Sequence, residues 1–200
     1  TGTSSASGTT DTANTTGTAS TASTGDVVTD GGSSGTTGEP GSGLELLVCS
    51  FVGDAVGRFD LDSGAFLGDL GPTDALDGAL GIVVGPDGRI YVASEESNAV
   101  VRFDGTTGAF LDRFVADDPL TMEDETGGLL GPGAVLFGAD GRFYVSSFDS
   151  DAILRYDGQI GAFVDVFVPA GAGGLDGPDA GMVFGPDGHL YVPGYYSNSI

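Results

Sequence analysis

The chain has 200 residues and is strongly acidic: 29 Asp and Glu residues stand against six Arg residues and no Lys, which gives a formal charge of −23. Nucleic acids and anionic membrane surfaces are bound through basic surfaces, so this balance excludes both as expected partners. No apolar run approaches the length needed to cross a bilayer, so the sequence predicts no transmembrane segment.

Residues 1–42 differ in composition from the rest of the chain. They contain 30 Ser, Thr or Gly residues, four acids and no base. Such a segment has too little apolar surface to offset its conformational entropy, so we expect a disordered, flexible linker. Aromatic residues occur only after this segment, and residues 43–200 are enough for one domain with a hydrophobic core.

Residues 43–200 predict short β-strands separated by turns. The first stretch, LELLVCS (44–50), corresponds to the second strand of the later units, so the first unit lacks its own first strand. The next unit begins with an apolar run and the turn GPDG (85–88), in which Pro fixes φ and Gly permits positive φ. The four strands expected in this unit are 81–85, 89–94, 99–104 and 109–115.

The same pattern recurs in one register. Arg-aromatic-Asp triplets begin at Arg58, Arg102 and Arg155, with spacings of 44 and 53 residues. The nine additional residues of the second interval indicate an insertion between Phe110 and Gly141. Four strands in about 45 residues, repeated along the chain, are typical of β-propeller blades. The strands of a β-sandwich do not repeat as a unit.

We therefore predict an all-β fold, a β-propeller of four-stranded blades preceded by a disordered tail. The units are expected at about 44–80, 81–131, 132–178 and 179–200, which amounts to three blades and part of a fourth. Because the first unit lacks a strand and the last is half present, we interpret the sequence as an excerpt of a longer protein. A full-length ring of this kind is expected to be a monomer.

The phrases GPDGRIYVAS, NAVVRFDGTTGAFL and GGLDGPDAGMVFGPDGHLYV resemble NHL-type repeats of secreted bacterial β-propellers. The resemblance covers about Leu46 to Ile200. It implies a ring that usually has six blades, in which the far C-terminus often supplies the missing first strand. Relatives implied by the resemblance include streptogramin-lyase-like and gluconolactonase-like enzymes as well as binding modules.

The turns between second and third strands are the main candidate sites. Each ends in Asp or Asn, whose side chain can close a turn, whereas the middle residues vary between units. Variable aromatic and acidic tips on one face of a fixed scaffold suit contact with a ligand or partner. The candidate binding residues are Phe51, Glu95, Glu96, Phe148, Asp149, Tyr195 and Tyr196, and the turn-ending residues are Asp54, Asn98, Asp151 and Asn198.

Other polar residues carry weaker hypotheses. The repeated Arg58, Arg102 and Arg155 each precede an Asp by two positions on the same strand face, so we expect a structural ion pair or a hydrogen bond to a neighbouring blade. His189 and Cys49 are interpreted as an exposed turn residue and a buried, inert thiol. Carboxylates of the inserted loop could bind Ca²⁺, although we favour a solvated acidic loop: Asp117, Asp118, Glu123, Asp124 and Glu125.

Two functions remain open at this point. The first is a non-catalytic binding or scaffold module, without catalytic residues or a required cofactor, that recognises a protein or carbohydrate. The alternative is a metal-dependent, lyase- or lactonase-like enzyme with its site over the central channel. The linker resembles those that follow a lipid-anchored Cys in bacterial lipoproteins, which implies an extracellular or cell-surface location and an anchor supplied by residues outside this chain.

Overall fold

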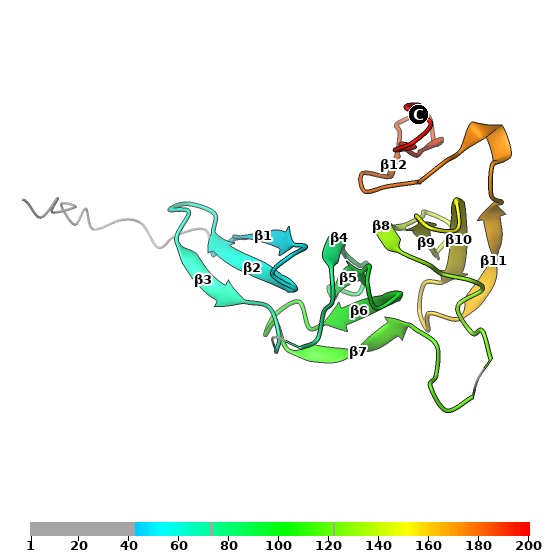
Figure 1. The fold of residues 1–200 in the computed structure, drawn as a ribbon. Coiled ribbons are helices and arrows are strands. Elements are labelled where there is room, and N and C mark those ends of the chain that lie inside the picture. The colour runs from blue at the N-terminus through cyan, green and yellow to red at the C-terminus, as the bar shows by residue number, and fades with distance from the viewer. Residues whose placement is uncertain (1–42, 73, 122) are drawn as a thin grey trace, which may run out of the picture. The chain divides into compact units, whose positions relative to one another are not determined.

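The computed structural model describes residues 43–72, 74–121 and 123–200, all within one unit of the chain, Glu39–Ile200. The predicted linker, residues 1–42, lies outside the described residues. Within the described part, four antiparallel sheets follow one another along the chain (Figure 1). Their strands are β1 (Glu45–Ser50), β2 (Ala55–Asp60) and β3 (Phe66–Asp69); β4 (Ala79–Val84), β5 (Ile90–Ser94), β6 (Ala99–Phe103) and β7 (Phe110–Val115); β8 (Pro132–Phe137), β9 (Arg142–Ser147), β10 (Ala152–Asp157) and β11 (Phe163–Val168); and β12 (Val183–Phe184) and β13 (Leu190–Tyr191).

The predicted all-β fold of four-stranded blades is confirmed. The second and third sheets have four strands in sequential order, and the first has three, as expected from its missing first strand. The fourth sheet has two short strands. One 3₁₀ turn, η1 (Ala172–Gly174), is the single helical element among the described residues, and the sequence did not predict it. No helix in the described part of the chain is long and apolar enough to cross a membrane.

The blades repeat in structure as they do in sequence. Their second and third strands pair in one register, so the residues that lie opposite each other are Leu47 and Arg58, Tyr91 and Arg102, and Tyr144 and Arg155. In the three later units the Asp of the first turn accepts a hydrogen bond from a Tyr hydroxyl. These bonds are Tyr91 to Asp87 (3.1 Å), Tyr144 to Asp140 (2.9 Å) and Tyr191 to Asp187 (2.7 Å). The shared contacts identify the repeat unit as a structural unit.

The partners of the repeated arginines correct our prediction. We expected pairing with the Asp two positions later or contact with a neighbouring blade, but each Arg pairs with a carboxylate on an adjacent strand of its own blade. Arg155 binds Asp165 through two hydrogen bonds of 2.8 and 2.6 Å. The nearby Asp157 instead accepts backbone N–H bonds from its own turn. Cross-strand pairs of opposite charge stabilise a sheet, and the turn needs its Asp as an acceptor.

Each hydrophobic core lies between two neighbouring sheets, because a single blade cannot bury both of its faces. Three clusters of buried side chains connect the four sheets in chain order. Representative members are Val56, Leu70 and Val101 between the first and second sheets; Tyr91, Phe114 and Phe143 between the second and third; and Tyr144, Ile153 and Met182 between the third and fourth. This packing between sheets is the arrangement of propeller blades.

Candidate functional site

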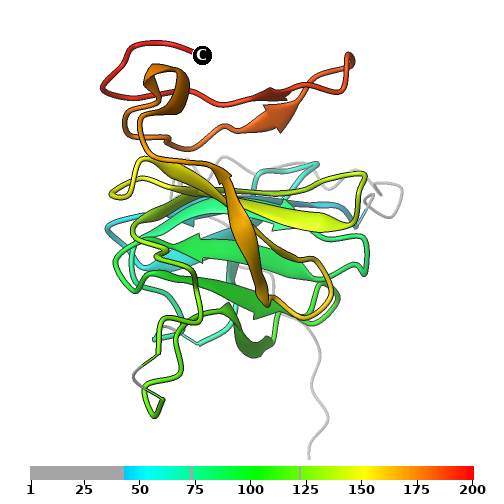
Figure 2. The same ribbon diagram turned by 90° about the vertical axis from the view of Figure 1, so that its right-hand side faces the viewer.

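The turns between second and third strands lie at one edge of the sheets, which we call the turn face. It comprises the turns 51–54, 95–98, 148–151 and 195–198. The loops that enter the blades reach the same edge. Backbone N–H groups of these turns donate to the loops in three blades: Glu95 to Gly78 (3.0 Å), Phe148 to Gly131 (2.9 Å) and Tyr195 to Gly177 (2.8 Å). Figure 2 shows the β9–β10 turn and the loop between β7 and β8 at one edge, and the β10–β11 turn at the opposite edge.

A repeated hydrogen bond joins the first three turns to the blade that follows each of them. Asp54, Asn98, Asp151 and Asn198 have φ values of 50 to 52°, the left-handed conformation that Asp and Asn tolerate. Our prediction that their side chains close their own turns is wrong for the first three, whose Oδ1 atoms accept from a buried glycine N–H of the following blade. The bonds are Gly78 to Asp54 (2.8 Å), Gly131 to Asn98 (2.8 Å) and Gly177 to Asp151 (2.7 Å).

Serine side chains fix the same loops from within the blade. Ser94 Oγ accepts from the Asp77 backbone N–H at 2.8 Å and donates to its carbonyl oxygen at 3.0 Å. Ser147 Oγ makes the same two bonds with Leu130, at 2.9 and 3.0 Å. Both serines are fully buried. The turns are therefore held on a hydrogen-bonded scaffold, which is the condition for presenting side chains in a defined geometry.

Three of the predicted aromatic residues form one cluster, in which Phe148 is half-buried. Ring centroids of Phe148 lie 6.1 Å from Tyr195 and 5.6 Å from Tyr196, and the two tyrosine rings are 5.0 Å apart. Tyr195 and Tyr196 remain 62% and 60% exposed. Phe51 does not belong to this cluster, because its ring packs over Gly78 beside Glu96. Rigid, exposed aromatic side chains supply large contact area at low entropic cost.

Acidic side chains lie beside these rings. Burial raises the pKa of Glu95 above its usual range, and Asp179, Asp149 and Glu96 raise it further by repulsion. The pKa of Glu96 is also raised, chiefly by its hydrogen bond with Asp77 and by that neighbour's charge. The predicted residues Glu95, Glu96 and Asp149 are thus brought together. Our sequence interpretation missed Asp77 and Asp179. Asp77 could have been found, because it precedes Gly78, a glycine that recurs at the equivalent position of the later units.

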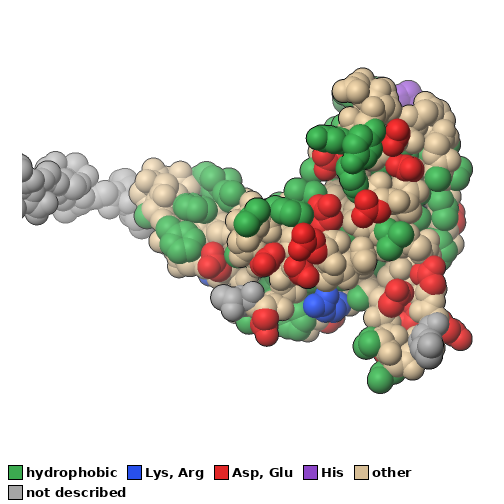
Figure 3. Space-filling view, viewed as in Figure 1, with side chains coloured by type: hydrophobic (Ala, Val, Ile, Leu, Met, Phe, Trp, Pro, Cys, Tyr) green, Lys and Arg blue, Asp and Glu red, His purple; other side chains and the backbone are tan. Residues whose placement is uncertain are grey.

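No base of the chain forms an ion pair with the acids of the turn face. All six Arg residues and His189 lie in the described residues, and the carboxylates in their ion pairs are Glu45, Asp87, Asp112, Asp157, Asp165 and Asp187, none of which belongs to this face. Arg113 is the one base with a hydrogen bond to this face among the described residues, and it donates to Ser97 Oγ at 3.3 Å. Figure 3 looks onto the turn face and shows acidic side chains gathered across its middle beside hydrophobic ones.

The inserted loop between β7 and β8 uses its own acids as hydrogen-bond acceptors. Asp117 Oδ1 accepts from the backbone N–H of Glu125 at 2.9 Å, and Asp124 Oδ1 accepts from that of Gly128 at 3.0 Å. The loop is anchored by the hydroxyl of Tyr156, which donates to the Thr126 carbonyl oxygen at 2.7 Å. Asp118 Oδ1 also accepts, from the backbone N–H of Leu120 at 2.9 Å, and all five acids of the loop are exposed. Within residues 43–72, 74–121 and 123–200, no group of three His, Cys, Asp or Glu side chains has a geometry that could hold a metal ion.

His189 is exposed as expected, whereas Cys49 was expected to be buried and is only partly so. His189 is exposed, and its Nδ1 lies 2.9 Å from Asp187 at the end of β13 opposite to the turn face. Cys49 is half-buried and packs against the cluster between the first two sheets. Burial raises the pKa of its thiol to about 11, so the reactive thiolate is scarce near neutral pH.

Comparison with solved structures identifies the class of fold as a β-propeller. The chain is similar to virginiamycin B lyase from Staphylococcus aureus (18% identity, TM-score 0.55, covering 76% of this chain and 46% of that one). It is also similar to hydrazine synthase from Kuenenia stuttgartiensis (18%, 0.55, 74% and 38%) and to an auxiliary nutrient binding protein from Bacteroides thetaiotaomicron (15%, 0.58, 78% and 44%). These likenesses confirm the predicted NHL-type propeller as the fold.

The chain spans less than half the length of each of these three structures. A scan against protein-family models found no match, and neither did a search of curated proteins. Since the similar structures include both enzymes and a binding protein, the shared fold is compatible with either class of function.

Proposed function

We propose that this protein is a non-catalytic binding module, at the cell surface or outside the cell, whose turn face recognises a partner that carries positive charge. The observation that carries the proposal is the cluster of exposed Tyr195 and Tyr196 with half-buried Phe148, held on hydrogen-bonded turns beside acids that form no ion pair with a base. Aromatic faces attract cations through their quadrupole, and complementary charge steers association.

The state of Glu95 gives further support. Its raised pKa reflects partial burial and the like charges of neighbouring acids. A cation bound beside Glu95 would relieve that repulsion, so binding and ionisation favour each other. A protein segment with Arg or Lys side chains meets both requirements, because these side chains carry charge and also stack on aromatic rings.

A hexa-arginine peptide is a suitable probe, with its affinity measured by calorimetry. We expect the double variant Tyr195→Ala, Tyr196→Ala to bind about tenfold more weakly than wild type, as loss of aromatic side chains that a partner covers does. Glu95→Gln should also weaken binding, while its melting temperature rises because repulsion is relieved. Neither change touches a core cluster.

Matched controls separate this site from general attraction to an acidic protein. Phe66 on β3 is 59% exposed, close to the exposure of Tyr196, and Asp69 is an exposed acid on the same strand. Phe66→Ala and Asp69→Asn should leave the peptide affinity unchanged. Equal losses in the control and turn-face variants would show that the peptide responds only to net charge, and the proposed site would be rejected.

A further inference from the structure

The junction between the first and second sheets departs from the repeat. At the next junction, aromatic rings of Tyr91, Phe114, Phe137 and Phe143 pack with centroid distances of 4.7 to 5.5 Å. Strand register gives the corresponding residues. Leu47 lies opposite Arg58, as Tyr91 lies opposite Arg102 in the next blade. Val84 lies opposite Ile90, as Phe137 lies opposite Phe143 in the next blade. The four equivalent residues are all aliphatic: Leu47, Leu70, Val84 and Ile90.

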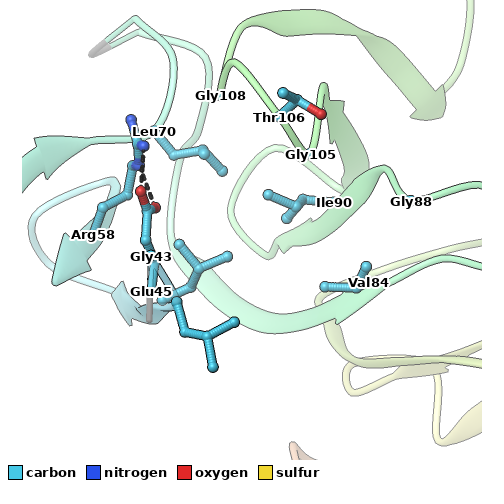
Figure 4. Close-up of a pocket in the computed structure, with 12 residues that line it drawn as sticks. Gly43, Glu45, Arg58, Leu70, Val84, Gly88, Ile90, Gly105, Thr106 and Gly108 are labelled. Atoms are coloured by element: carbon cyan, nitrogen blue, oxygen red, sulfur yellow. Dashed lines mark hydrogen bonds and ion pairs between the residues drawn. The ribbon is translucent and has the colours of Figure 1, made fainter. Parts of the chain in front are cut away.

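A cavity of about 440 Å³ lies where the aromatic cluster would be, with all four aliphatic residues in its lining. Figure 4 shows Leu70 and Ile90 pointing toward each other from the two sheets, with Arg58 and Glu45 on one wall. Thr106 and the backbone of several glycines complete the lining. A cavity of this size falls within the range of small-molecule sites, and its lining combines apolar side chains with polar groups in similar measure.

Arg58 lacks the ring that covers its counterparts. The guanidinium carbon of Arg102 lies 4.9 Å from the ring centroid of Phe114, and that of Arg155 lies 4.7 Å from that of Phe167. Leu70 is the equivalent residue beside Arg58, and no ring of the described residues lies over this guanidinium. Residues 1–42 contain no aromatic side chain, so the segment that precedes the cavity cannot supply one.

The Arg58 side chain is nevertheless fixed. In the other blades the paired acid comes from the outer strand, at Asp112 and Asp165, whereas the residue opposite Arg58 on β3 is Gly68. Glu45 of β1 takes over this role with two hydrogen bonds of 2.7 Å, from Nε and Nη2 of Arg58. Two parallel bonds hold the guanidinium plane in one orientation, and its charge is balanced.

We propose that this cavity binds a neutral, planar aromatic small molecule, whose ring takes the place of the missing side-chain ring against Arg58 and between Leu70 and Ile90. The ligand would supply the stacking that Phe114 and Phe167 provide within the chain at the other two junctions. This site is separate from the turn face and does not depend on its proposed function.

The test compares 2-naphthol with its saturated analogue, decahydro-2-naphthol, by calorimetry. We expect saturable binding of 2-naphthol to wild type and binding of the saturated analogue that is roughly three- to thirtyfold weaker, the range of a guanidinium–ring contact. Arg58→Lys keeps the charge but removes the planar group, so it should weaken the binding of 2-naphthol by a similar factor.

Leu70→Phe restores the side chain found at the equivalent positions of the next two blades. It should abolish 2-naphthol binding and raise the melting temperature, since the new ring occupies the place against Arg58 that the ligand ring would take and reduces the empty volume. Absence of saturable binding to wild type would overturn the proposal. Equal affinity for the two compounds, or unchanged 2-naphthol binding to both Arg58→Lys and Leu70→Phe, would equally overturn it, because the site would then lie elsewhere or lack ring selectivity.

Discussion

Replacing Phe143 by Ala is expected to lower the free energy of unfolding by about 3–5 kcal/mol, the usual cost of removing a buried aromatic ring. The side chain is fully buried, and its ring lies within 5.5 Å of the rings of Tyr91, Phe114 and Phe137. These rings come from two sheets, so the variant weakens the contact between blades. Such a loss is a large fraction of the stability of an ordinary domain.

Ile90→Ala is the matched control, because Ile90 holds the equivalent position at the junction with the cavity. It is almost fully buried, but one side of it already faces the cavity of about 440 Å³. Fewer contacts are lost there, so the expected cost is smaller than that of Phe143→Ala. Chemical denaturation measures both. A cost below about 1 kcal/mol for Phe143→Ala would contradict packing of the blades through these clusters.

Replacing Asp151 by Ala is expected to cost roughly 2–4 kcal/mol, the sum of a lost charge-assisted hydrogen bond and of left-handed backbone strain. The variant leaves the buried N–H of Gly177 without its 2.7 Å acceptor and places Ala at a φ of 52°. Buried donors without a partner are costly, and Ala disfavours this conformation. The turn that carries Phe148 should also become more mobile, which hydrogen exchange at the turn amides would report.

Two further substitutions at this position separate the causes. Asp151→Asn keeps the acceptor, as Asn98 does in the preceding blade, and should remain close to wild type in stability. Asp151→Gly removes the acceptor but fits the backbone, so its cost should fall between those of Asn and Ala. If all three variants unfold at the same denaturant concentration as wild type, the hydrogen bond between the blades contributes nothing measurable to stability.

The fold was accessible from the sequence because its evidence is local and repeated. Turn residues such as Asp87 and Gly88, with apolar strands on either side, recur in one register and define a blade without any knowledge of long-range contacts. The blade junctions were less accessible. Asn98 and Gly131 are separated by an insertion that the other units lack, so their hydrogen bond cannot be recognised from a fixed spacing.

The candidate sites were predicted unevenly for a related reason. The turn residues were found because they vary within a constant frame, but whether Phe148 and Tyr196 touch depends on how two blades pack. The cavity was missed because our sequence comparison looked for polar residues that break the repeat. The informative change was between apolar residues, from Phe114 to Leu70, which becomes visible only when the repeat is aligned by strand register.

The most direct test of the turn face as a binding surface is to map the hexa-arginine peptide on ¹⁵N-labelled protein by NMR. Our account predicts saturable chemical-shift changes concentrated in the turns 95–98, 148–151 and 195–198, with amides around the exposed Phe66 and Asp69 unaffected. Changes spread over acidic residues of every face, or centred on the opposite turns such as 85–88, would contradict it. In that case the charge of −23 attracts cations without a dedicated site.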